Sequence, residues 1–188
     1  MSTALAFDAD FDFTFDVVDG FFKTPRIQRT LNAIHKTEVS GWEKWWQIEL
    51  ALYLSTHGGV SDRGMEEEFN TDRRRERVKD WLAIDIFFRR KRCASDKMEL
   101  KQNPDWRRCI DNMLLDVAKV HRSQQRSMGN LSIRNFFVLG VYPSVEKSEV
   151  KGYIFERALL KEKTVSDFEI DRVETRFISG TDYSFTLF

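Results

Sequence analysis

Cysteine and histidine are scarce in this chain of 188 residues, which contains two Cys and three His. Cys93 and Cys109 do not have the spacing of a zinc site, and His35, His57 and His121 are scattered along the chain. The sequence therefore excludes a Cys-rich zinc site, and it predicts two reduced thiols rather than a disulfide framework.

Motifs of several large enzyme classes are missing as well. The chain has no glycine-rich phosphate loop, no serine nucleophile elbow and no Rossmann fingerprint, and it has no internal repeat or low-complexity linker. Its apolar runs are too short to cross a bilayer, and Met1 is not followed by a basic segment and an apolar stretch of the signal-peptide kind. We therefore expect a cytoplasmic protein without a membrane partner.

The overall composition is that of a folded globular protein. Hydrophobic residues make up 41% of the sequence and charged residues 32%, with five Trp and 16 Phe, which argues against disorder. The length suits one domain over residues 1–188 that is large enough to bury a core. Within it we expect a core at residues 40–144, an N-terminal strand and helix at 1–39, and a C-terminal helix and hairpin at 145–188.

Positive charge is concentrated in the middle of the chain, although the net charge is zero. Residues 1–70 carry 6 Lys and Arg against 12 Asp and Glu, and residues 127–188 carry 8 against 9. Residues 71–126 carry 16 against 9, an excess of seven positive charges. Such an excess is expected for a polyanion partner, but a solvated charged face would have the same composition.

The N-terminal segment alternates apolar residues with acids. Residues 7–16 read FDADFDFTFD, and this period of two predicts a half-buried strand. The following segment, PRIQRTLNAIHK, predicts a short helix that begins at Pro25 and has Ile27, Leu31 and Ile34 on one face.

A second helix is predicted over residues 42–56. Ser40 and Glu43 have the spacing of a capping box at its start, and a glycine pair ends it. Glu49 lies among the aromatic and aliphatic residues of this helix, where an acid needs a cation, a metal ion or a hydrogen-bonding partner. The alternative is that Glu49 lies on the one polar edge of the helix.

Residues 81–103, WLAIDIFFRRKRCASDKMELKQN, predict a β-hairpin with polar residues at unusual places. Asp85 interrupts the first apolar run, Glu99 interrupts the second, and Lys101 follows two positions later. Because side chains alternate along a strand, Glu99 and Lys101 point to the same face. This pattern indicates a divalent-metal site for phosphodiester cleavage, and the structural alternative is a surface hairpin with a cross-strand ion pair.

The remaining segments complete an alternation of helices and strands. Residues 60–69 fit either a first strand or an exposed turn, and residues 104–123 predict an amphipathic helix. Residues 133–144 are nearly all apolar, which is typical of a strand covered on both faces. A charged helix is expected at 146–163 and a terminal hairpin at 168–188.

This order of elements, with Asp85, Glu99 and Lys101 at the hairpin, resembles the core of the PD-(D/E)xK nuclease superfamily. That superfamily includes restriction-enzyme-like and Holliday-junction-resolvase-like proteins. The resemblance implies an α/β (α+β) fold with a mixed central sheet flanked by helices, a core of order αβββαβ, and extra terminal strands. A second acid-x-lysine triplet, at residues 149–151, lies in a charged helical segment without an upstream strand acid.

The resemblance also implies roles for individual residues. Asp85 and Glu99 would be the metal-binding acids, the backbone carbonyl of Leu100 a further ligand, and Lys101 the catalytic lysine. Glu49 resembles the acid that many members place in the first core helix. Carboxylates are suited to Mg²⁺ or Mn²⁺, which would activate a water and neutralise phosphate charge, while the lysine positions or deprotonates that water or stabilises negative charge. One departure from the motif is that no proline precedes Asp85.

The expected function is therefore that of a metal-dependent nuclease, acting on DNA more readily than on RNA. Seven residues that flank the site are expected to bind nucleic acid without reading its sequence: Arg73, Arg74, Arg75, Arg89, Arg90, Lys91 and Gln102. The alternative is a non-catalytic binding module on the same fold, such as an immunity or regulatory protein that binds a protein partner. Strand edges near both termini leave open a homodimer or another protein partner.

Overall fold

The computed structural model describes residues 3–70, 81–91, 93, 95–126, 135–160 and 172–188. Its helices are α1 (Thr3–Phe22), α2 (Pro25–Thr37), α3 (Glu43–Thr56), α4 (Trp106–Arg126) and α5 (Lys147–Leu160). Its strands are β1 (Val60–Asn70), β2 (Trp81–Arg90), β3 (Ser95–Gln102), β4 (Asn135–Pro143), β5 (Glu174–Phe177) and β6 (Tyr183–Leu187). The chain is a mixed α/β protein, and the predicted fold class is confirmed at that level.

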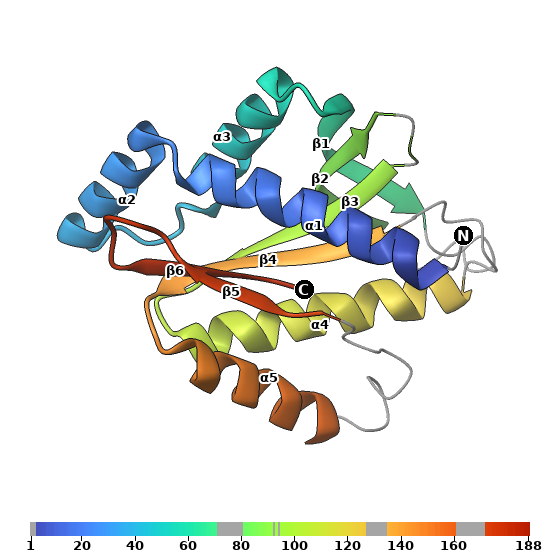
Figure 1. Cartoon of the computed structure of the whole chain (residues 1–188). Helices are drawn as coiled ribbons and strands as arrows, with labels where there is room; N and C mark the ends of the chain where they lie inside the picture. The colour runs from blue at the N-terminus through green and yellow to red at the C-terminus, as the bar shows by residue number, and fades with distance from the viewer. Residues whose placement is uncertain (1–2, 71–80, 92, 94, 127–134, 161–171) are drawn as a thin grey trace.

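The strands form one mixed sheet in the order β1-β2-β3-β4-β6-β5. Strands β1, β2 and β3 are an antiparallel meander, whereas β4 is parallel to β3 because α4 crosses over between them. Strand β6 then pairs antiparallel with both β4 and β5. Helices α1, α2 and α3 lie on one side of the sheet, and α4 and α5 lie on the other (Figure 1). The order from α3 to β4 is α-β-β-β-α-β.

The strand predicted for residues 7–16 is wrong, because this segment is part of the long helix α1. Phe11, Phe15, Val18 and Phe22 are all buried and are spaced by four, three and four residues. That spacing places them on one face of a helix. A spacing of four is also a multiple of two, so the phenylalanines satisfied the strand period as well as the helical one.

The hydrophobic core lies on both sides of the sheet. On the α1–α3 side it is rich in aromatic residues, such as Trp46 of α3 and Phe185 of β6. On the α4–α5 side Met113 and Ile154 are fully buried. Strand β4 contributes to both cores through alternating side chains, so the prediction that this strand is covered on both faces is confirmed. Each fully buried side chain of this size contributes roughly 1.5–3 kcal/mol to stability.

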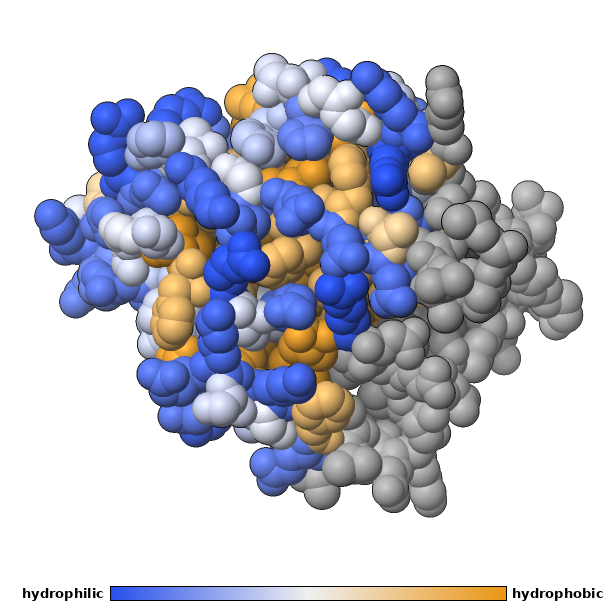
Figure 2. All heavy atoms as spheres, viewed as in Figure 1, coloured by the Kyte–Doolittle hydropathy of each residue, from blue (hydrophilic) through white to orange (hydrophobic). Residues whose placement is uncertain are grey.

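Other local predictions are also confirmed. Helix α2 buries Ile27, Leu31 and Ile34, as its apolar spacing predicted. The C-terminal hairpin is the β5–β6 pair. For residues 60–69 the sequence left a strand and an exposed turn open, and the structure shows strand β1. Figure 2 shows a largely hydrophilic surface on the side viewed in Figure 1, with apolar atoms visible between charged side chains near its middle. Within the described part of the chain, none of the helices combines the length and apolar character needed to span a membrane.

Candidate functional site

The backbone pairing of β2 with β3 stops partway along the two strands. The ladder runs from Arg89 opposite Ser95 to Ile86 opposite Met98. At the next position the side chain of Asp85 replaces the ladder, because its Oδ2 accepts a hydrogen bond of 2.8 Å from the backbone N–H of Leu100. This gap in the sheet places a carboxylate between two strands, where a regular sheet has only backbone groups.

A side chain of helix α3 also forms a hydrogen bond to the backbone at the gap. The side-chain amide of Gln47 donates a hydrogen bond of 2.8 Å to the backbone carbonyl of Asp85. Gln47 itself is only 3% exposed, so the interaction is shielded from water. The opening between β2 and β3 is therefore held by polar contacts rather than being a frayed end.

Glu99 lies next to Asp85 in this gap. It is 6% exposed, and its carboxyl is hydrogen-bonded to the Asp85 carboxylate. Burial raises the pKa of Glu99 to about 9, the negative charge of Asp85 adds to the increase, and the nearby Lys101 ammonium opposes it. At neutral pH the carboxyl group of Glu99 is therefore protonated and donates a hydrogen bond to the Asp85 carboxylate.

The ammonium group of Lys101 lies among several oxygen atoms. Its Nζ is 2.7 Å from Oδ2 of Asp116 and 3.6 Å from Oε2 of Glu99, and it donates a hydrogen bond of 3.1 Å to the carbonyl of Leu100. Burial disfavours the charged ammonium, but the neighbouring Asp116 and Glu99 carboxyl groups raise the pKa of Lys101 above its usual value. Lys101 is therefore a positive charge at any physiological pH.

Two further acids come from the helices on either side of the sheet. Glu43 is the first residue of α3, and its Oε2 accepts a hydrogen bond of 3.0 Å from the backbone N–H of Gln102. Burial raises the pKa of Glu43, and Lys101 opposes that effect. Asp116 comes from α4 on the opposite side of the sheet.

We call these five residues the acidic cluster: Asp85, Glu99, Lys101, Glu43 and Asp116. Fully ionised, four carboxylates against one ammonium would leave three net negative charges in a partly buried space. Like charges at such short range repel strongly where little water is present. The cluster therefore has a strong tendency to bind a proton or a cation.

A glycine allows α4 to approach closely enough for Asp116 to take part. Gly140 of β4 lies beside Lys101 in the β3–β4 register. A Cβ atom at Gly140 would lie 2.3 Å from Sδ of Met113 and 3.1 Å from Sγ of Cys109, both on α4. A larger residue would overlap these side chains, so either they or α4 would have to shift. Asp116 is three residues beyond Met113, which places it about one helical turn further along the same face.

The structure brings together three of the four side chains that the sequence predicted to meet. Asp85, Glu99 and Lys101 meet at the gap, with the Leu100 carbonyl beside them. Glu49 does not join them, because its carboxylate forms an ion pair with Arg26 of α2 and lines a separate pocket. Glu49 lies six positions after Glu43 in the helix, which turns the two side chains about 120° apart around α3.

None of the described basic residues that were expected to contact nucleic acid belongs to the acidic cluster. Arg73, Arg74 and Arg75 lie outside the described residues. Arg89 forms an ion pair of 3.4 Å with Asp62, and Arg90 lies 3.8 Å from Asp10 and 5.2 Å from the ring centroid of Phe13.

Arg89, Arg90 and the exposed Lys91 lie at the hairpin end of β2, four to six residues beyond Asp85. That separation is roughly 13–20 Å along a strand. The half-exposed Gln102 is adjacent to the cluster, since its backbone N–H binds Glu43.

Glu43, Gln47 and Asp116 were missed as site residues. Glu43 was assigned to a capping box with Ser40, but α3 has Trp42 as its N-cap and no side-chain cap hydrogen bond. The signal that was available is the i,i+4 spacing of Glu43 and Gln47, which puts both on one face of the helix. Asp116 had no comparable signal, because its role depends on how closely α4 packs on the sheet.

The donor atoms of the cluster are chemically suited to a hard divalent cation. Within the described ranges, no set of three or more His, Cys, Asp or Glu side chains is arranged to hold a metal ion. The ligand set that the PD-(D/E)xK resemblance implies needs only Asp85, Glu99 and the Leu100 carbonyl, since Mg²⁺ retains several waters. Two of these donors, Glu99 Oε2 and the Leu100 oxygen, already face a positive charge, the Lys101 ammonium. The oxygen atoms of these residues therefore have the chemistry that Mg²⁺ prefers, although the described side chains are not arranged as a metal-binding group.

No protein-family model matches the chain, and no curated protein and no solved structure matches it either. The geometry of the acidic cluster is consequently the basis for a functional proposal.

Proposed function

We propose that the chain is a Mg²⁺- or Mn²⁺-dependent nuclease of the PD-(D/E)xK type that hydrolyses phosphodiester bonds of DNA. The observation that carries the proposal is the meeting of Asp85, Glu99 and Lys101 at the gap between β2 and β3. These are the residues that the resemblance assigns to the site. The αβββαβ order from α3 to β4 is also the order that the resemblance implies.

In this proposal Asp85, Glu99 and the carbonyl of Leu100 hold the metal ion. The ion would lower the pKa of an attacking water and neutralise charge on the phosphate. Glu99 must release its proton to serve as a ligand, and its high pKa shows that the folded chain without a cation resists this. Metal binding and loss of that proton are therefore coupled.

Lys101 acts in this proposal as a positive charge rather than as a base. Its raised pKa and its ion pair with Asp116 keep it protonated. A fixed ammonium beside the scissile phosphate stabilises the negative charge that develops during hydrolysis. Asp116 orients this ammonium from α4, and Glu43 replaces Glu49 as the acid of the first core helix.

Cleavage of supercoiled plasmid DNA tests the proposal. The native chain is expected to cleave the plasmid in the presence of Mg²⁺ or Mn²⁺ and not in the presence of EDTA. Lys101→Ala and Asp85→Ala should each reduce the rate by roughly 10²–10⁴-fold, because each removes a group that acts on the reacting atoms. The matched control is Lys151→Ala, which changes the lysine of the other acid-x-lysine triplet, on the exposed side of α5.

Two outcomes would contradict the proposal. Equal cleavage by the native chain and by the Lys101 and Asp85 variants would assign the activity to a contaminant or to another site. Absence of cleavage by the native chain, together with absence of Mn²⁺ binding in calorimetry, would favour the alternative of a non-catalytic binding module.

A further inference from the structure

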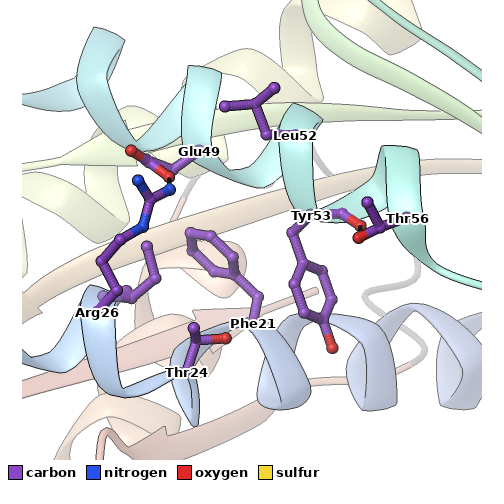
Figure 3. A pocket seen from close by; sticks show the side chains of 8 residues that line it. Phe21, Thr24, Arg26, Glu49, Leu52, Tyr53 and Thr56 are labelled. Carbon is purple, nitrogen blue, oxygen red and sulfur yellow. Dashed lines mark hydrogen bonds and ion pairs between the residues drawn. The ribbon is translucent and has the colours of Figure 1, made fainter.

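A pocket of about 190 Å³ lies where helices α1, α2 and α3 meet (Figure 3). Glu49 of α3 and Arg26 of α2 line it, and they form the ion pair described above. None of the described residues that line the pocket belongs to the acidic cluster. The pocket is therefore a second candidate site with its own chemistry.

Aromatic rings form a rigid wall of this pocket. Phe21 of α1 and Tyr53 of α3 pack edge to face, with ring centroids 5.7 Å apart and an interplanar angle of 68°. Gly20 allows this approach, because a Cβ atom there would lie 2.5 Å from the Tyr53 hydroxyl. Ile27 adds a buried aliphatic side chain, while Leu52, which is 54% exposed, also lines the pocket. The apolar part of the pocket is thus formed before any ligand enters.

The two members of the ion pair differ in exposure. The Glu49 side chain is 14% exposed, whereas the Arg26 side chain is 62% exposed. In Figure 3 the guanidinium of Arg26 reaches from α2 to the Glu49 carboxylate on α3. An ion pair whose cation remains largely in water contributes roughly 0–1 kcal/mol to stability. Arg26 is therefore a cation that a ligand can displace at small energetic cost.

The two threonine hydroxyl groups of the pocket present acceptors rather than donors. Thr24 donates its hydroxyl proton to the carbonyl of Gly20, at 3.4 Å, and Thr56 donates its own to the carbonyl of Tyr53, at 3.1 Å. Their oxygens keep lone pairs for a ligand. Together with the Glu49 carboxylate and the electron-rich ring faces, this environment favours a positively charged donor.

We propose that this pocket binds a small organic cation, namely an amine or guanidinium on an apolar stem. The charged group replaces Arg26 at the Glu49 carboxylate, and the stem contacts the rings of Phe21 and Tyr53. This site does not depend on nuclease activity, since it shares no described residue with the acidic cluster.

Three probes with the same ring and different head groups test the proposal: phenethylamine, 2-phenylethanol and 3-phenylpropionate. Binding to the full chain is measured by calorimetry and by amide chemical shifts. Phenethylamine is expected to bind saturably and roughly tenfold more tightly than the neutral alcohol, because a charge-assisted hydrogen bond to Glu49 is added. The carboxylate probe is expected to bind most weakly, and the shifts should map to Phe21, Glu49 and Tyr53.

Two substitutions give opposite expected results. Glu49→Gln should reduce phenethylamine affinity roughly tenfold and bring it close to that of the alcohol. Arg26→Ala should increase phenethylamine affinity, because the amine no longer competes with the guanidinium. Arg29→Ala, an exposed arginine on the same helix that does not line the pocket, is the matched control and should leave affinity unchanged.

Several results would overturn the proposal. One is equal binding of the amine and the alcohol to the native chain. Another is preferential binding of phenylpropionate that is lost in Arg26→Ala, which would make the pocket an anion site. Absence of saturable phenethylamine binding would also overturn the proposal. If Glu49→Gln fails to fold, the probe series on the native chain and on Arg26→Ala still decides the question.

Discussion

Helix α3 carries two glutamates, Glu43 and Glu49, that lie in opposite kinds of electrostatic environment. Glu43 belongs to a cluster in which four acidic side chains surround one ammonium, and burial raises the pKa of Glu43. Glu49 forms a one-to-one ion pair with Arg26 beside an aromatic pocket. The two residues have the same chemistry and the same helix, so their different environments come from where each lies along α3 and from the direction in which each points.

This contrast shows that the local charge balance, rather than the presence of an acid, marks a site that needs a cation. Around Glu49 the chain supplies its own positive charge from α2. Around Glu43 and Glu99 it supplies too little positive charge, and burial raises the pKa of both acids. The acidic cluster is therefore suited to take up an additional cation, whereas the pocket is suited to exchange one cation for another.

The largest expected effect comes from changing the two acids of α3 in the same way. Glu43→Gln should reduce Mg²⁺-dependent plasmid cleavage roughly 10- to 100-fold, as is usual for residues that support a metal site. Glu49→Gln should leave the cleavage rate within about twofold, because its carboxylate lies in the other site. Rates are compared at saturating Mg²⁺. A larger loss for Glu49→Gln than for Glu43→Gln would reverse the assignment of the two acids.

The pH dependence of stability should differ between the two regions. Glu99 has an ordinary pKa of 4.5 when unfolded and a pKa of about 9 in the folded chain. Between these values only the folded state holds the proton, so unfolding releases it and the free energy of unfolding falls as pH rises, levelling off above pH 9.

Glu99→Gln removes this loss and should stabilise the chain by about 4 kcal/mol at pH 8 relative to its effect at pH 5, since the loss is about 1.4 kcal/mol for each pH unit in this range. Urea unfolding at the two pH values, without added metal, measures the difference. Glu49→Gln is the control and should show no comparable change with pH. An unchanged pH dependence in Glu99→Gln would show that the titrating group is another residue.

Gly140→Ala should weaken the acidic cluster through packing. The added methyl group would overlap the side chains of Met113 and Cys109, and the expected destabilisation is about 1–2 kcal/mol. Because α4 carries Asp116, cleavage should also fall while amine binding to the α1–α3 pocket stays the same. Gly152→Ala in α5 is the matched control, since a Cβ there meets no atom within 4 Å, and it should be neutral or slightly stabilising. Equal stability of the two variants would mean that α4 adjusts freely.

The smallest expected effect is the loss of protein stability when the ion pair of the pocket is removed. Arg26→Ala should reduce the free energy of unfolding by less than about 1 kcal/mol, because the guanidinium is largely exposed. Lys101→Ala, which removes the one ammonium from among the carboxylates of the cluster, should cost more. Thermal unfolding of both variants at low salt compares them directly. A larger loss for Arg26→Ala would show that this ion pair holds α2 and α3 together.

Strand alternation and hairpin length were sufficient to predict that Asp85, Glu99 and Lys101 meet at the gap. Asp85 and Glu99 lie on opposite strands of one hairpin, and the observed pairing of Ile86 with Met98 places them next to each other. These are local properties of the chain. The buried character of β4 was predictable for the same reason, since a run of apolar residues has no polar face to expose.

The prediction that Glu49 lies at the site failed for a different reason. The apolar residues of α3 do not form one clear stripe along the helix. Ile48 and Leu52 are apolar but 42% and 54% exposed, so the apolar residues do not identify the face that packs on the sheet. Without that face the direction of each glutamate is undetermined. The N-terminal helix was mistaken for a strand because its phenylalanines fit both periods, and Asp116 depends on a helix-to-sheet distance that Gly140 sets from another element.

The gap between β2 and β3 also turns one backbone amide into a reporter. The N–H of Leu100 is held by the Asp85 side chain instead of by a neighbouring strand. Its rate of hydrogen exchange with solvent therefore depends on where that carboxylate is directed, whereas amides in the regular ladder depend on opening of the strands. Hydrogen-exchange NMR on the Leu100 amide, which lies within the sheet, can thus detect a rearrangement of the acidic cluster without a known substrate.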